Sequence, residues 1–410
     1  MKRYFLLDQG DFFVHFLDMS QVELLKELKD ISSGRVQSWL TLSAQLSTAV
    51  VKRQMVLDTG ADRSIERYLL SSLRCNFASE SLVDRLDDIH ASSGGIRLQE
   101  ARTPSRHLYG AMNRDLTGIE AFFLDFQCVP FPLTLILSQT AISNYQLLFR
   151  HLFFVKHVER RLVGTWLDNQ AMKEFQSLRK SLAPTLGLRQ RMLHFIQNLV
   201  YYMMFEVIEP KWQSMESTIL RRKNEGSWSV DGANKGGGDS GQTVDDVLAA
   251  HNNFLRQTLR ECLLTNGNLI RTLTKLMTTC LLYCDQMDLF VEMTQINEER
   301  ERIAKEERKK RQQNISINSF SKKSRARAKT AMAARKARRG EHLERLEQEL
   351  DSQSYKRMIS RFNEVFNNNL KDFMEKLTSN GDERFQSYCS NLCTRLDYNG
   401  FISGSLKLDA

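Results

Sequence analysis

The stretch YQLLFRHLFFVKHVERRL occupies residues 145–162, and its apolar residues recur at steps of three or four. That spacing brings them onto one face of an α-helix, while residues such as Arg150 and Glu159 fall mostly off that face. A helix with one apolar stripe packs that stripe against a core. The sequence therefore predicts an amphipathic helix over 143–162, whose buried stripe consists of Tyr145, Leu148, Leu152, Val155, Val158 and Leu162.

A second long helix is predicted over 186–209. Further apolar residues cover most of its sides, and a helix of that kind is buried between neighbours. Pro210 follows, and the residue before a proline avoids helical backbone, so the helix is expected to end near Glu209. Its main apolar stripe consists of Met192, Ile196, Leu199, Met203 and Val207.

The composition extends this helical pattern to the whole chain. The 410 residues include only 5 prolines and 20 glycines, and because these residues punctuate turns, their scarcity favours long uninterrupted elements. The expected fold class is mainly α, and an all-β sandwich is excluded. Further helices are predicted after the N-cap Asp11 and over 355–377 and 383–396. Another is predicted to start at Thr243, with Asp245 and Asp246 in its first turn, where the helix dipole favours acidic residues. Segment 119–137 is expected to be buried and extended or turning, because Pro130 and Pro132 forbid a straight helix.

The sequence also indicates the compartment. No apolar window reaches the roughly 18 residues of a membrane span, so no membrane partner is expected. The apolar run behind the N-terminus is too short for a secretory signal. The seven cysteines are an odd number scattered over a long chain, which does not fit a disulfide framework. An intracellular, reduced and soluble protein is predicted.

Three polar segments are expected between the helices: a long loop over 91–116, a glycine-rich loop over 225–241 and a basic insertion over 298–345. Within the insertion, Lys305 to Arg339 contains 14 basic and 2 acidic residues. This stretch therefore has a net charge of +12. Because the whole chain has a net charge of +9, the remaining residues together have a net charge of −3. Three interpretations stay open: contact with nucleic-acid phosphates or a partner's acidic tails, a nuclear-import signal, or a solvated insertion without a partner. The candidate polyanion-binding residues are Lys309, Lys310, Arg311, Lys322, Lys323, Arg325 and Arg327.

Residues that would indicate catalysis or a cofactor are not arranged in a recognisable pattern. The glycine cluster at 236–241 lacks the Gly-Lys-Ser/Thr ending of a phosphate-binding loop. Two cysteine pairs at i, i+4, 280/284 and 389/393, are expected as small core residues rather than zinc ligands. The histidines at 15, 194 and 251 each have apolar neighbours and are expected as satisfied core or interface residues. Neither an enzyme nor a cofactor is predicted, and no metal site.

Four long segments, in order, carry a resemblance to a known family. They are YFLLDQGDFFVHFLD at 4–18, YQLLFRHLFFVKHVERRL at 145–162, LRQRMLHFIQNLVYYMMFEVIEPKW at 188–212 and DDVLAAHNNFLRQTLRECLL at 245–264. They closely resemble the C-terminal half of the gamma-tubulin complex components. The ending RLDYNGF at 395–401 is similar to the component 2 branch of that family.

The resemblance implies one gamma-tubulin-binding domain over 1–410, made of packed helical bundles with long loops. It implies gamma-tubulin as partner, together with other components of the complex, component 3 in particular. The implied role is a non-catalytic scaffold for microtubule nucleation in the cytoplasm and cytoskeleton, at microtubule-organising centres and spindle poles. The family's N-terminal domain, which makes lateral contacts, has no counterpart before Met1, so gamma-tubulin binding is expected here rather than autonomous ring assembly.

The helix over 188–212 is the first candidate for the gamma-tubulin surface, since residues off its apolar stripe are available to face a partner. Arginine and tyrosine combine a large contact area with hydrogen bonds, and both are favoured at interfaces. The alternative function is a basic nucleic-acid- or microtubule-binding module centred on Lys305–Arg339, although a nucleic acid is not the expected partner. The candidate gamma-tubulin contacts are Arg191, His194, Phe195, Asn198 and Tyr201, with Asp8, Asp11 and Phe131 as second choices.

Overall fold

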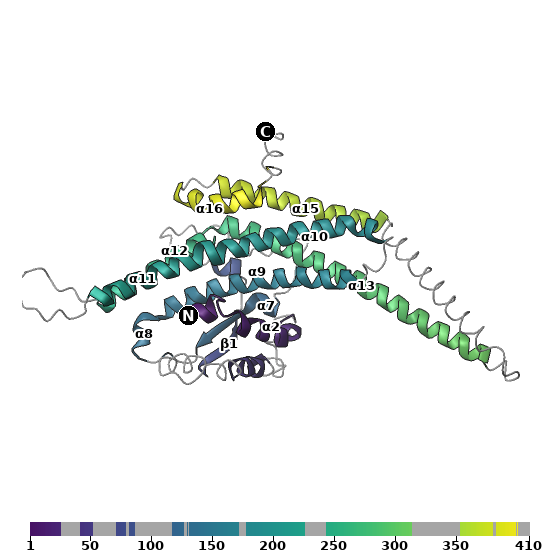
Figure 1. Ribbon diagram of the computed structural model, residues 1–410, viewed down its shortest axis with the longest axis horizontal. Helices are drawn as coiled ribbons and strands as arrows, with labels where there is room; N and C mark the ends of the chain where they lie inside the picture. Colours follow the sequence, from purple (N-terminus) through teal and green to yellow (C-terminus); the bar gives the residue numbers. More distant parts are fainter. Residues whose placement is uncertain are drawn as a thin grey trace, which may run out of the picture. The chain divides into compact units, whose positions relative to one another are not determined.

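The computed structural model describes residues 1–25, 42–51, 71–78, 82–86, 117–126, 129, 131–171, 178–225, 243–313, 353–379, 383–398 and 400. The chain packs as two compact units, each made of discontinuous segments. Unit 1 comprises 1–157, 198–271 and 376–401, and unit 2 comprises 158–197, 272–375 and 402–410. Figure 1 labels most of the helices and strand β1.

Unit 1 begins with two helices and a two-stranded sheet. Helix α1 covers Lys2–Phe5 and α2 covers Gly10–Leu24. Strands β1 (Leu73–Phe77) and β2 (Phe122–Phe126) pair antiparallel, with Leu73 opposite Phe126. Phe122 is fully buried, and its ring packs on those of Phe16, Phe149 and Phe153. The helical periodicity did not predict this sheet, whose strands lie far apart in the sequence.

The helix predicted over 143–162 is confirmed as part of α9, which covers Gln139–Ala171. Every residue of its predicted stripe is buried. In the unit 1 part of α9, the Tyr145 hydroxyl and Nε2 of His251 are hydrogen-bonded at 3.0 Å. His251 is therefore a core histidine, as predicted, with Nε2 satisfied and the buried Nδ1 without a hydrogen-bond partner.

The predicted second helix is longer than its apolar pattern indicated. Helix α10 covers Leu178–Tyr201, a π-helix η4 covers Tyr202–Ile208, and α11 covers Glu209–Glu225 without a break. The expected end at Glu209 is wrong. Pro210 occupies the first turn of α11, directly after the π-helix. The wider π-helical turn leaves room for the proline ring and already departs from the i to i−4 hydrogen-bond pattern that a proline would interrupt. The buried stripe of this helix is as predicted.

Two further helices of unit 1 come from later parts of the chain. Helix α12 covers Val244–Glu261, and α16 covers Glu383–Leu396. Helix α12 starts as predicted, and Thr243 is its N-cap: the Thr243 hydroxyl accepts a hydrogen bond from the Asp246 backbone N–H at 3.2 Å, and Asp246 completes a capping box. Helix α12 packs against α11, η4 and α16, and also against the short helix α8, which covers Leu133–Ile136.

Unit 2 takes its helices from α9, α10, α13 (Gly267–Gln313) and α15 (Gln353–Thr378). Phe195 of α10 packs edge-on against Phe366 and Phe373 of α15. The Tyr283 hydroxyl donates to the Thr185 backbone carbonyl at 3.0 Å, and the Thr185 and Tyr355 hydroxyls are 2.7 Å apart. Aromatic packing and these buried hydrogen bonds hold the helices of unit 2 together.

Some of the predicted segments differ in the structure, and others lie outside the described residues. Segment 119–137 is only partly buried: the short helix α7 (Gly118–Ala121) and β2 carry its core residues, whereas the Phe131 side chain is 79% exposed and that of Leu135 is also exposed. Helix α2 begins at Gly10, so Asp11 lies in its first turn rather than at the cap. The loop predicted over 91–116 lies outside the described residues, as does all but the first residue of the loop over 225–241. The α13 backbone continues as helix into the basic insertion, to Gln313.

Candidate partner-binding surface

Two neighbouring aromatic side chains of unit 1 are exposed at the start of the π-helix η4. Tyr202 and Met203 are buried in it, but Tyr201 just before it is 45% exposed and Phe205 within it is 62% exposed. The two exposed rings contact each other, with centroids 5.1 Å apart. Aromatic residues left in contact with water side by side indicate an interaction surface more strongly than a single exposed ring does.

An arginine and a glutamate hold this aromatic pair. The Arg395 guanidinium carbon lies 4.3 Å from the Tyr201 ring centroid, which is a cation–π contact. The same guanidinium forms an ion pair with the Glu206 carboxylate on η4. We call Tyr201, Phe205, Glu206 and Arg395 the aromatic face. It joins residues from α10, η4 and α16.

Buried polar contacts support the aromatic face from within unit 1. The Tyr202 hydroxyl donates to the Glu261 backbone carbonyl at 3.1 Å. The Glu261 side chain is itself buried, and its carboxylate accepts an ion pair from Lys211 Nζ at 2.8 Å. Lys211 Nζ also lies 5.2 Å from the ring centroid of Tyr388 on α16. These contacts fix η4, α11, α12 and α16 together, so the backbone under the aromatic face is well supported.

The candidates from the first part of α10 belong to unit 2. Arg191 and His194 are exposed. The Arg191 guanidinium donates to the side-chain oxygens of Asn363 and Asn367 on α15. Arg191 therefore bonds within its own unit, although its exposed position leaves it accessible.

Phe195 does not belong to a partner surface. The sequence placed it off the apolar stripe, yet it is only 1% exposed. Its ring lies between helices, with centroids 5.8 Å from Phe373 and 6.2 Å from Phe366. The expectation was wrong because α15 covers this second side of α10, and the spacing within α10 carries no information about that neighbour.

The remaining candidates lie in unit 1 at separate places on the chain. Asn198 is half-buried on α10, one turn before Tyr201. Asp8 is exposed between α1 and α2, with its carboxylate 4.0 Å from Lys2 Nζ. Asp11 is also exposed and accepts a hydrogen bond from Gln9 at 3.0 Å. Phe131 is exposed just before α8.

Candidates in the basic insertion fall outside what the structure shows in detail. Lys309, Lys310 and Arg311 lie on the backbone of α13, and those from Lys322 to Arg327 lie outside the described residues. Their role as a polyanion-binding cluster stays a prediction.

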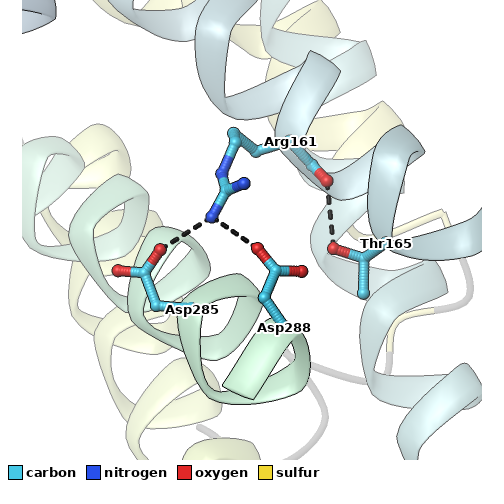
Figure 2. A network of polar contacts seen from close by, with 4 residues as sticks. All are labelled: Arg161, Thr165, Asp285 and Asp288. Atoms are coloured by element: carbon cyan, nitrogen blue, oxygen red, sulfur yellow. Dashed lines mark hydrogen bonds and ion pairs between the residues drawn. The ribbon is translucent and has the colours of Figure 1, made fainter. Parts of the chain in front are cut away.

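Figure 2 shows a polar network of unit 2. The helical spacing placed Arg161 off the apolar stripe of its helix but did not predict its partners. Nη2 of Arg161 on α9 lies 2.8 Å from a carboxylate oxygen of Asp285 and 2.8 Å from one of Asp288, both on α13. Burial lowers the pKa of Arg161, but the charges of Asp288 and Asp285 outweigh that cost and raise it overall. The guanidinium therefore stays charged and links α9 to α13.

Metal binding and thiol chemistry find no support among the described residues. They contain no group of three or more histidine, cysteine or acidic side chains that could hold a metal ion. The thiols of Cys280, Cys284 and Cys389 are buried, and burial raises the pKa of Cys284 to about 11 and that of Cys389 to about 12. A thiol that remains protonated is a poor nucleophile and a poor metal ligand. Among the described helices, none is long and apolar enough to cross a membrane.

A supported aromatic face on packed helices is what a helical protein-interaction module presents. The comparison with known proteins agrees and is more specific: the chain belongs to the family described as gamma tubulin complex component C-terminal, which it matches over residues 1–401. It is 31% identical to gamma-tubulin complex component 2 of Mus musculus over 409 residues, 99% of this chain and 40% of that protein. It is 28% identical to the component 2 homolog of Drosophila melanogaster, again over 99% of this chain and 40% of the relative.

A fungal relative has a different name. The chain is 29% identical over 312 residues to the spindle pole body component alp4 of Schizosaccharomyces pombe, which covers 71% of this chain and 37% of that protein. The chain therefore spans about two fifths of the length of the curated relatives it matches. These relatives confirm the resemblance to the component 2 branch that the sequence suggested, and they give no support to a nucleic-acid-binding alternative.

Proposed function

We propose that this chain is a non-catalytic scaffold that binds gamma-tubulin and thereby contributes to microtubule nucleation. The observation that carries the proposal is the family match over nearly the entire chain. The physical logic is geometric. Holding gamma-tubulin molecules side by side removes in advance much of the entropy cost of assembling the first ring of tubulin, as orienting two reactants does in catalysis.

The names of the relatives support a partner and a place. Besides component 2 proteins, the chain resembles gamma-tubulin complex component 3 of Homo sapiens, at 24% identity over 272 residues. We propose component 3 as the neighbouring scaffold in the complex. The spindle pole body relative supports a location in the cytoplasm and cytoskeleton, at microtubule-organising centres.

Two exposed aromatic positions of unit 1 are candidates for the contact with gamma-tubulin. One is the aromatic face, and the other is Phe131. In unit 2, exposed Arg191 and His194 remain candidates. A stable complex buries about 800 Å² per partner. Within such an area a few residues contribute most of the binding energy, so one or two aromatic anchors with surrounding polar contacts are enough for a specific interface.

A pull-down with purified gamma-tubulin tests the function. We expect immobilised gamma-tubulin to retain the intact chain, with the mouse component 2 relative as positive control. Loss of the chain in the wash, under conditions that retain the relative, would show that this chain does not bind gamma-tubulin.

Charge reversal tests the unit 2 candidates. Arg191→Glu combined with His194→Glu introduces two negative charges on the exposed side of α10. If that side contacts gamma-tubulin, retention falls while thermal stability changes little, because both side chains are exposed. Unchanged retention removes both residues from the interface.

A further inference from the structure

We propose that Tyr201 and Phe205 are the aromatic anchors through which this chain contacts gamma-tubulin, and that Arg395 and Glu206 are positioning residues that hold the anchors ready. This inference rests on the proposed function and assigns its contact. Of these four residues, only Tyr201 was a candidate from the sequence.

Exposure is the first reason. The Phe205 and Tyr201 side chains are large and apolar, yet both remain in contact with water within unit 1. Aromatic rings contribute strongly to interfaces because they bury a large area with few rotatable bonds. Because the two rings contact each other, they present one continuous apolar surface that is larger than the surface of either ring alone.

The backbone is the second reason. The π-helix η4 keeps Tyr202, Met203, Val207 and Ile208 buried, while Phe205 on the same turn points to solvent. A π-helical turn is less stable than an α-helical one and occurs frequently at functional sites. Here it coincides with the aromatic anchors of the face.

Pre-organisation is the third reason. Arg395 lies over the Tyr201 ring and forms an ion pair with Glu206, one residue after Phe205. Because both rings are already held, they lose less side-chain freedom when a partner covers them. Phe131 is more exposed, but in the described part of the chain no ring or cation contacts it.

Charge balance indicates the chemistry of the surface that fits here. The Arg395 charge is paired with Glu206, and the nearby Lys211 charge is paired with Glu261. The face therefore offers rings and a tyrosine hydroxyl rather than unpaired charge. Such a face suits a partner surface with an apolar hollow and a hydrogen-bond acceptor at its edge, and the proposed function makes gamma-tubulin that partner. Such a contact depends weakly on salt, in contrast to polyanion binding.

The test measures the affinity of the intact chain for immobilised gamma-tubulin by biolayer interferometry. We expect Phe205→Ser and Tyr201→Ser each to weaken binding at least tenfold. The control Val14→Ser removes an exposed apolar side chain of α2, which also belongs to unit 1, and we expect a change below twofold. Phe131→Ser tests the competing candidate before α8. Wild-type affinity should change less than threefold between 50 and 300 mM salt.

The positioning role needs a readout that general destabilisation would not change. Arg395→Gln should weaken binding about fivefold in the wild-type background and have no effect in the Tyr201→Ser background, since the ring it holds is then missing. Arg395→Lys keeps the cation and should restore most of the affinity. Glu206→Gln repeats the test from the other side of the ion pair, and thermal midpoints confirm that each variant is folded.

The outcomes separate the inference from the function. Wild-type binding with unchanged affinity in Phe205→Ser and Tyr201→Ser overturns the aromatic contact and leaves the function standing. If Phe131→Ser weakens binding instead, the contact lies at the turn before α8, and the aromatic-face inference is also overturned. No binding by the wild-type chain overturns the proposed function, and this inference with it.

Discussion

His151 on α9 makes the stability of this protein depend on pH. Its side chain is 0% exposed, and neither ring nitrogen has a hydrogen-bond partner. Burial lowers the pKa of His151 from 6.5 to about 4, because a charged imidazolium would lose its hydration in the core. The folded chain therefore holds His151 neutral at pH values where the unfolded chain already binds a proton.

The sign and size of the effect follow from that difference. Between pH 6.5 and 4 the unfolded state binds more protons than the folded state, so stability falls as the pH falls. The full difference, at about 1.4 kcal/mol for each pH unit, is about 3 kcal/mol and is reached below pH 4. At pH 5 the loss relative to pH 7.5 is about 2 kcal/mol.

Substituting a non-titrating residue of similar size tests this reasoning. His151→Leu should remove about 2 kcal/mol of the pH dependence between 7.5 and 5, without breaking a hydrogen bond. At pH 7.5 it should be neutral or stabilising, because two unsatisfied buried nitrogens are removed. The assay is urea denaturation followed by far-UV circular dichroism. Midpoints at the two pH values are compared, since a chain with two units does not guarantee a two-state transition.

A core substitution on the same helix provides the control. Phe153→Leu changes packing but adds or removes no titrating group, so it should lower both midpoints and leave their difference as in the wild type. If His151→Leu shows the same drop between pH 7.5 and 5 as the wild type, His151 is not protonated on unfolding in the way described, and the argument from burial is refuted.

Three further substitutions test how the helices are held. Thr243→Ala removes the N-cap of α12 and should cost about 1 kcal/mol, seen as faster amide exchange in the first turn; unchanged exchange would mean that the cap contributes nothing. Lys211→Met leaves the buried carboxylate of Glu261 without its ion-pair partner and should cost about 3 kcal/mol or more by thermal denaturation, with partial recovery when Glu261→Gln is added. Arg161→Gln should cost about 1 kcal/mol at low salt and less at high salt, because the pairs in Figure 2 are partly exposed; a loss independent of salt would argue for a packing role instead.

Much of the fold could be predicted because helical signals are local. The spacing of Tyr145, Leu148 and Leu152 defines one face of a helix, and that face is buried. Thr243 caps α12 because its hydroxyl reaches a backbone N–H only three residues away. Signals of this kind need no knowledge of distant parts of the chain.

The candidate site was predicted less well, for a related reason. Tyr201 was found because it lies off the apolar stripe, but the same rule selected Phe195, which α15 buries. Arg395 lies at the end of the helix predicted over 383–396, and the residues around it in the sequence do not indicate a contact with Tyr201. The sheet was missed because β1 and β2 are single short strands that become recognisable only when paired.

The sequence by itself therefore determined the helical class, the stripes that two of the long helices bury and the family. Periodicity decides which residues share a face, and the order of several long segments identifies relatives. The tertiary structure alone decided which remaining faces stay open, because an open face depends on whether another element covers it. That is why Phe195 lies in a core and Phe205 in water, although both lie off the same stripe.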